Sequence, residues 1–266
     1  MKKPLVTSIV VLLSLVLSAH EFWLEPEKFI YQWNDDINVR FYVGENFEGQ
    51  NWSGDSSKIQ KLDLYYSNVK DDLTTYMTGN PGDSLQLKVL DEGTSMIAFN
   101  STNSFIELEP EKFKAYLLED GLYNALEYRE ANRETDRNGR EYYQRSVKTL
   151  FQIGEPFGAT AKKETGLPVD ILLLDNPYEK QSGDTITAKI LFEKNPLPHQ
   201  LVKVWTRLDQ QTRRIDLESD ENGMIRFRVE RQGTWMISTV RMVRIENDDR
   251  ADWQSYWGSA TWGYQE

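Results

Sequence analysis

Short segments in which polar and apolar residues alternate recur along most of this chain. Residues 37–43 alternate and then meet a glycine-containing turn, and residues 84–89 and 95–99 flank the turn-forming run Asp91-Glu92-Gly93. Alternation with period two places apolar side chains on one face of a strand, and such turns favour hairpins. The pattern therefore predicts a chain rich in β-strands.

The second half of the chain shows the same pattern more regularly. Turn signals recur roughly every 8–12 residues, which is typical of a β-sandwich. The strand candidates are residues 186–192, 201–207, 224–229, 234–243 and 257–264. We predict a C-terminal β-sandwich over residues 166–266, after a linker rich in Gly, Pro, Thr and Lys.

One region interrupts the strand pattern. Glu109-Pro110 opens a helix, in which Phe113, Tyr116 and Leu117 share a face. A second helical stretch follows at 122–133, and residues 140–153 have the pattern of a segment that starts helical and ends as a strand. We predict an N-terminal β-sandwich over residues 20–165 that carries a helical insertion at about 109–147.

The first residues have the pattern of a signal peptide. Lys2 and Lys3 precede an apolar stretch over residues 5–17, and Ser18-Ala19 precedes the polar residue His20. We expect residues 1–19 to be removed and the protein to be periplasmic or on the cell surface. The apolar stretch is short for a membrane span of ~20 residues. An uncleaved N-terminal anchor is the alternative, and no stable transmembrane span is expected after cleavage.

Composition excludes several kinds of chemistry. The chain has no cysteine, two histidines and a formal net charge of −11. It therefore has no thiolate metal ligand or cysteine nucleophile, and its acidity argues against a nucleic-acid partner. It also lacks a His-Glu-x-x-His run, a Gly-x-Ser-x-Gly run and a phosphate-binding glycine loop. We expect no enzymatic activity, with a hydrolase that uses paired carboxylates as the alternative.

Several segments together resemble a known family. They are residues 20–26, 43–49, 113–122, 140–148, 176–178, 182–184 and 251–257. Taken together, these segments are similar to the exported bacterial domain-of-unknown-function family often labelled NikM-like, after a component of nickel and cobalt uptake. The resemblance implies an exported β-sandwich protein whose second half is immunoglobulin-like or prealbumin-like. Members often carry a histidine in the strand after Trp235, where this chain has Arg241.

The resemblance and the N-terminus together suggest a transition-metal site. If cleavage follows Ala19, His20 supplies both a free amino group and an imidazole nitrogen, donors that suit copper, nickel or zinc, and the resemblance adds cobalt. His199 is the only other histidine, so both are candidate ligands. The simpler alternatives are an exposed chain end at His20 and a solvated loop residue at His199. The partner would be a metal transporter or an outer-membrane receptor.

Other residues allow different interpretations. Trp253, Trp257 and Trp262 could form the platform of a carbohydrate- or protein-binding module, although sheet packing explains them more simply. Two runs, at 136–139 and 220–223, resemble the start of a calcium loop, but each also makes a good hairpin turn. The basic and aromatic residues of 140–148 could bind an anion or pair with acids inside the protein.

Overall fold

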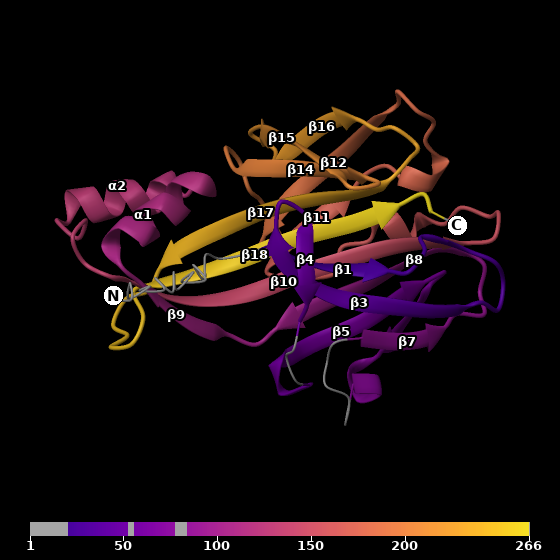
Figure 1. Ribbon diagram of the computed structural model, residues 1–266, viewed down its shortest axis with the longest axis horizontal. Coiled ribbons are helices and arrows are strands. Elements are labelled where there is room, and N and C mark those ends of the chain that lie inside the picture. The colour runs from indigo at the N-terminus through magenta and orange to yellow at the C-terminus, as the bar shows by residue number, and fades with distance from the viewer. Residues whose placement is uncertain (1–20, 53–55, 78–83, 266) are drawn as a thin grey trace, which may run out of the picture.

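β-Strands dominate the computed structural model, which describes residues 21–52, 56–77 and 84–265 (Figure 1). The predicted mainly β fold with sandwich packing is confirmed. In the described residues the strands form a central sheet and two smaller outer sheets. These three sheets make three layers, and the two helices lie at one end of the central sheet (Figure 1).

The central sheet contains strands from both ends of the chain. Its strands are β2 (Ile30–Tyr31), β5 (Ile59–Tyr66), β6 (Val69–Asp72), β8 (Gly93–Ser101), β9 (Ser104–Leu108), β10 (Gly139–Ile153), β14 (Leu201–Leu208), β15 (Gln211–Glu218), β17 (Thr234–Arg244) and β18 (Trp253–Gly263). The order across the described part of the sheet is β15-β14-β17-β18-β10-β8-β5-β6, and β2 and β9 pair with the two ends of β10.

The other elements flank this sheet. The N-terminal outer sheet comprises β1 (Glu21–Pro26), β3 (Asp36–Glu45), β4 (Glu48–Asn51) and β7 (Ser84–Lys88), and the C-terminal outer sheet comprises β11 (Val169–Leu173), β12 (Thr185–Phe192), β13 (Asn195–Pro196) and β16 (Met224–Arg228). The helices are α1 (Pro110–Glu119) and α2 (Tyr123–Ala131), with 3-10 turns at Ser56–Lys58, Thr74–Met77, Ala159–Lys162 and Pro177–Glu179.

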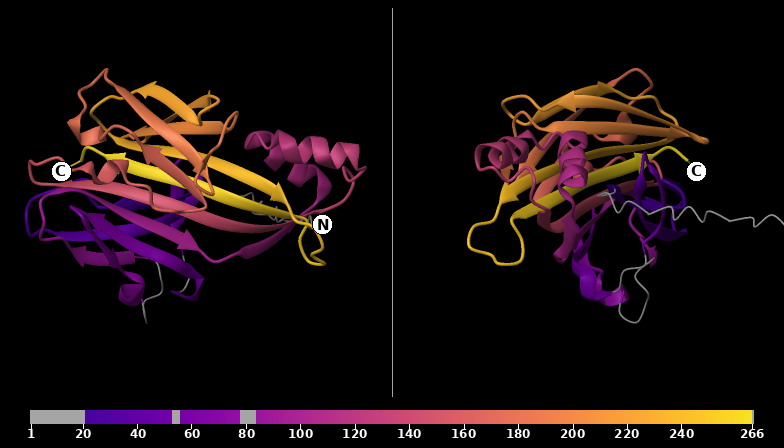
Figure 2. Two further views of the ribbon diagram at one scale, coloured as in Figure 1. Left: turned by 180° about the vertical axis from the view of Figure 1, so that it is seen from behind. Right: turned by 60° about the vertical axis from the view of Figure 1, so that its left-hand side comes forward.

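The two outer sheets cover opposite faces of the central sheet. Ile97 and Phe99 of β8 pack in the same core as the N-terminal outer sheet, whereas Met96 and Ala98 pack in the core of the C-terminal outer sheet. The two views of Figure 2 show these layers on either side of the long strands β10 and β18. Because strands such as β8 are buried on both faces, their sequences alternate weakly.

Strands from the two halves of the sequence pair directly at the centre. β10 runs parallel to β18, with Glu141 opposite Trp253 and Thr149 opposite Thr261. The boundary predicted at 165/166 falls in the connection that follows β10. The two sandwiches therefore share one sheet, and this sheet carries side chains from both ends of the chain.

The helical insertion is shorter than predicted. α1 buries Phe113, Tyr116 and Leu117 as its spacing indicates, and α2 buries Ala125 and Arg129. Helix over residues 140–147 is wrong, because β10 already begins at Gly139. β9 and β18 lie on either side of this segment and supply backbone partners that a helix there would lose.

Candidate functional site

A buried cluster of charged side chains lies where α1 ends against the start of β1. Glu21 is the first residue of β1, Asp120 follows the last residue of α1, and Lys203 lies within β14. The side chains of these three residues are at most 10% exposed. Charged groups are rarely buried this deeply unless they are paired, so the contacts between them define the site.

The ammonium group of Lys203 is the centre of this cluster. Its Nζ lies 2.8 Å from Oδ1 of Asp120, 3.7 Å from Oε1 of Glu21 and 3.6 Å from Oε1 of Glu119. Three carboxyl groups therefore share one buried cation. Glu21 comes from β1, whereas Glu119 and Asp120 come from the end of α1, so the cluster forms only when both elements pack against β14.

The turn after α1 fixes the place of Asp120. Its backbone N–H donates to the carbonyl groups at the end of the helix, and Gly121 follows with φ +63°. A Cβ at Gly121 would lie 2.8 Å from the Cβ of Leu201. Glycine therefore permits both the left-handed turn and the close approach to β14, which also carries Lys203.

The two buried acids of this cluster, Glu21 and Asp120, bind protons more tightly than usual. Burial raises the pKa of Glu21 to about 7, although the charge of Lys203 opposes the shift. Burial also raises the pKa of Asp120. Burial alone would lower the pKa of Lys203, but the nearby carboxylates hold it above its ordinary value. One positive charge, on Lys203, thus lies among more carboxyl groups than it can neutralise. The cluster can therefore take up or release protons near pH 7.

A further carboxyl group is buried beneath α1. Glu141 of β10 is 1% exposed. Its Oε1 accepts hydrogen bonds from the hydroxyl groups of Tyr116, at 3.2 Å, and of Ser255. The indole of Trp257 donates to the same Ser255 hydroxyl at 3.0 Å and stacks on the ring of Tyr116. Burial raises the pKa of Glu141 to about 8, so this carboxyl group is mostly neutral at pH 7.

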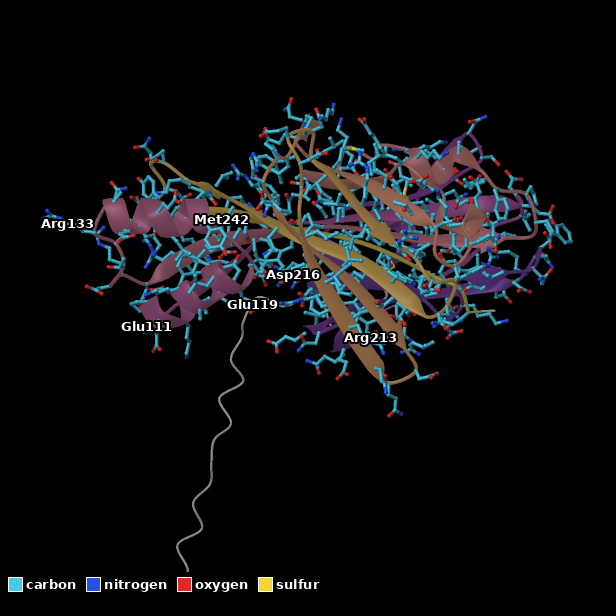
Figure 3. The ribbon with its side chains drawn as sticks, turned by 90° about the horizontal axis from the view of Figure 1, so that it is seen from above. Glu111, Glu119, Arg133, Arg213, Asp216 and Met242 are labelled. Carbon is cyan, nitrogen blue, oxygen red and sulfur yellow. The ribbon has the colours of Figure 1, made fainter. Side chains whose placement is uncertain are left out.

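The cluster reaches solvent on the side of Glu119. The Glu119 side chain is 61% exposed and accepts a hydrogen bond of 2.9 Å from Arg214, which also donates to Asp216 at 3.1 Å. This hydrogen bond lowers the pKa of Glu119. Figure 3 shows Glu119, at the end of α1, close to Asp216 of β15. A cavity of about 10 Å³ lies deeper, lined by Glu21, Asp120 and Lys203 among others, and it has room only for a water-sized group.

Of the two histidines predicted as metal ligands, His20 lies outside the described residues. In the sequence it directly precedes Glu21. His199 lies in the loop before β14 with φ +53° and a side chain that is 60% exposed. Its ring nitrogens lie 3.1 Å from Glu218 and 3.1 Å from Glu221, and these contacts raise the pKa of His199.

The described residues do not form a complete metal site by themselves. Over residues 21–52, 56–77 and 84–265, no group of three or more His, Asp or Glu side chains is arranged to hold a metal ion. In the charged cluster, the ammonium group of Lys203 lies among the carboxyl groups. A metal there would need donors from beyond this set.

The three tryptophans considered for a sugar platform are inside the protein. Trp253, Trp257 and Trp262 are 1%, 7% and 0% exposed. The platform interpretation is therefore wrong at these positions, because Trp262 stacks on Trp235 in the core beneath the C-terminal outer sheet, and Trp253 packs under α2. Sheet and helix packing explain all three.

The basic block of residues 140–148 serves internal packing. Arg140 donates two hydrogen bonds to Asp252, at 2.8 and 2.9 Å, and Lys148 pairs with Asp170 where both side chains are at most 3% exposed. The interpretation of an anion-binding block is not supported at these two residues. At 220–223, Asp220 accepts hydrogen bonds from the backbone of Asn222 and Met224, as expected for a turn.

Sequence reasoning missed the charged cluster. A signal was present at Lys203, a charged residue in the middle of the apolar run at 201–205. No comparable signal marks Glu141, since it is one acid among 42 acidic residues. Arg241 is half-buried opposite Tyr256, and its guanidinium lies 5.9 Å from the ring centre of Phe192.

In the described part of the chain, no helix combines the length and apolar character needed to cross a membrane. No curated protein matches the sequence. Among solved structures, the chain aligns with murine CEACAM1b at 10% identity, over 90% of this chain and 96% of that one, with a TM-score of 0.21. Native Escherichia coli alpha-2-macroglobulin aligns at 8% identity, over 94% of this chain, and the chain spans only 14% of its length, with a TM-score of 0.21.

A third solved structure, dimeric latent PorU from Porphyromonas gingivalis, aligns at 11% identity over 97% of this chain and 21% of its own length, with a TM-score of 0.17. TM-scores of this size carry no argument about function. The match to a sequence family is more extensive: residues 17–242 match the family described as "Domain of unknown function (DUF4198)", which indicates no enzymatic family. This chain therefore belongs to the DUF4198 family.

Proposed function

We propose that this protein is an exported binding or accessory protein that handles a divalent transition metal, such as nickel, cobalt or copper, during uptake. In this proposal residues 1–19 are a signal peptide, and His20 becomes the N-terminus of a periplasmic or cell-surface protein. The resemblance to NikM-like chains suggests the role in uptake. A metal transporter or an outer-membrane receptor would be the partner.

One structural observation carries the proposal. Glu21, the residue bonded to His20, is buried against Asp120 and Lys203. In this proposal the amino group and imidazole of an N-terminal His20 bind the metal together with carboxyl groups of this cluster, of which Glu119 reaches solvent. A free amino group and an imidazole at this position are good donors for nickel or copper, and carboxylate oxygens complete such donor sets.

The carboxyl groups around Lys203 support the proposal that His20 is a necessary ligand. Glu21 and Glu119 both lie within 4 Å of the Lys203 ammonium group, so the cluster already stabilises a positive charge. A metal held by His20 and carboxyl groups of this cluster would add a second positive charge to it. Lys203 limits how many of these carboxylates a second cation can use, and a site without the nitrogen donors of His20 would be weak.

Metal binding at this position should tighten as the pH rises. Glu21 loses its proton near its pKa of about 7, and a chain amino group ordinarily does so near 7.7–8.0. Both groups are better metal donors without the proton. Affinity measured between pH 6 and pH 8 should therefore increase, and constant affinity across this range would exclude these donors.

The test is isothermal titration of nickel, cobalt and copper into protein whose N-terminus has been identified as His20 by mass spectrometry. We expect saturable binding of one ion, and we expect His20→Ala to abolish it. His199→Ala is the matched control, since His199 has its own partners in Glu218 and Glu221. Loss of binding with both variants would assign a site shared by the two histidines. Binding unaffected by His20→Ala would contradict the proposal.

A further inference from the structure

A second concave surface lies away from the charged cluster, where the two halves of the chain meet. It is a groove of about 520 Å³, within the range of about 300–1,000 Å³ that small-molecule sites occupy. Its floor is one face of the central sheet, and its walls come from the connection at 166–168 and from the turn between β12 and β13.

Neighbouring strands of the central sheet each place one polar side chain in this groove. Tyr256 of β18 lies directly opposite Gln144 of β10, and Asn100 of β8 and Gln60 of β5 continue the line. Gln144 donates from Nε2 to Oε1 of Gln60 at 2.7 Å, and Asn100 donates to the carbonyl oxygen of Arg145 at 2.7 Å. These hydrogen bonds fix the amide groups in place before any ligand arrives.

This row of polar side chains still has donors and acceptors free for a ligand. Toward other described residues, the amide nitrogen of Gln60, the amide oxygen of Gln144 and the hydroxyl group of Tyr256 make no hydrogen bond. Together they offer a donor, an acceptor and a group that is both. Tyr256 is partly exposed, and its ring is held against Phe192 with ring centres 5.1 Å apart.

The charges around the groove are balanced. Its charged lining residues are Glu193 and Lys194, of opposite sign, in a turn where both residues have positive φ. A floor of amides and a phenol does not suit a metal ion or a strongly charged ligand. It suits a neutral molecule that both donates and accepts hydrogen bonds, such as the hydroxyl groups of a sugar, and a partly exposed aromatic ring adds apolar contact with a sugar ring.

The placement on a sheet face also favours a sugar over a peptide. An extended peptide binds a sheet by pairing with the free backbone of an edge strand. β18 has paired neighbours on both sides, and at the groove β10 pairs with β18 on one side while the backbone C=O and N–H of Arg145 bond to the side chains of Asn100 and Ser101, so no free backbone edge is offered there. We propose that this groove binds a neutral oligosaccharide, with Tyr256, Gln144 and Gln60 as its contact residues.

The test is a titration of the whole mature chain with four neutral oligosaccharides: maltohexaose, cellohexaose, laminarihexaose and chitohexaose. Binding is followed by NMR chemical shifts and calorimetry. We expect at least one to bind saturably, and we expect Tyr256→Ala and Gln60→Ala each to weaken binding about tenfold or more. Tyr123→Ala, which removes an exposed tyrosine from the start of α2, should leave the affinity unchanged.

Gln60→Ala keeps the test decisive if Tyr256→Ala fails to fold. Gln60 is exposed, so its replacement should not unfold the sheet. Saturable binding that is equal in wild type and Gln60→Ala, and equal in folded Tyr256→Ala, would overturn the proposal. So would the absence of saturable binding to all four sugars, or binding of peptides at the groove in their place. None of these results depends on metal binding at His20.

Discussion

Glu141 shows how a single buried acid couples the stability of this protein to pH. Its pKa in the folded protein is about 8, whereas an exposed glutamate has an ordinary pKa near 4.3. The folded state thus holds a proton that the unfolded state releases between these values. The free energy of unfolding should therefore fall as the pH rises through this interval, and it should level off above pH 8.

Glu141→Gln mimics the protonated side chain at every pH. The variant should be closest to the wild type in stability at the acid end of the range, near pH 5, and exceed it most at pH 8–9, because the buried charge no longer has to form. The slope removed is at most about 1.4 kcal/mol per pH unit. Urea unfolding between pH 5 and pH 9 measures this. Glu111→Gln, at an exposed position on α1, is the control, and a parallel pH dependence of wild type and Glu141→Gln would refute the assignment.

Lys203 stabilises the folded protein by pairing with buried acids, and this stabilisation should grow, not fall, as the pH rises. Lys203→Met leaves Asp120 and Glu21 buried without their cation, and breaking a buried pair in this way costs about 3–5 kcal/mol. The loss should be smaller at pH 5 than at pH 8, because both carboxyl groups can then take up protons. Lys88→Met, which removes an exposed pair with Asp36, should change stability little. Equal losses for the two variants in thermal unfolding would show that the cluster is not a buried charge network.

Among the elements, β10 depends on one small residue where it begins. A Cβ at Gly139 would lie 2.1 Å from the ring of Phe113 in α1, which is fully buried. Gly139→Ala should force α1 away from the sheet and destabilise the protein by about 1–3 kcal/mol or more. Gly158→Ala is the matched control, because its nearest neighbour would lie at 3.5 Å. Chemical unfolding of both variants should separate them, and equal stabilities would contradict the packing described here.

The elements also show how far the sequence could predict the fold. The spacing of Phe113, Tyr116 and Leu117 was sufficient to predict α1, because a helix on a surface keeps its apolar residues on one side. It was not sufficient for β10, whose partner β18 lies more than 100 residues later in the chain. Its second half, residues 146–153, is also buried on both faces and lacks the simple alternation that marks a half-exposed strand.

The candidate site was predictable only in part. His20 was predicted as a ligand from the cleavage pattern and lies outside the described residues, and Lys203 could have been noticed as a charge within an apolar run. Asp120 and Glu141 could not be selected, because their role depends on α1 docking against β14 and β18. Those contacts join residues far apart in the sequence, and one sequence carries no local signal for them.

For the whole molecule, the shared central sheet implies cooperative unfolding. β10 and β18 pair over nine residues and connect the two predicted sandwiches through one sheet. Calorimetry should therefore show a single transition, with the calorimetric and van't Hoff enthalpies in agreement. Two separated transitions would mean that the sandwiches unfold independently, despite the strands that they share.

The proposed metal function depends on the amino group of His20, and one measurement tests this directly. Nickel affinity is compared between protein that begins at His20 and protein with a Gly-Ser-Gly-Ser extension before His20. The extension keeps the imidazole and removes the adjacent amino group. We predict that the extended protein binds nickel at least about tenfold more weakly. Equal affinity, or no nickel binding by either protein, would contradict a metal site formed by this N-terminus beside the carboxyl groups of Glu21 and its neighbours.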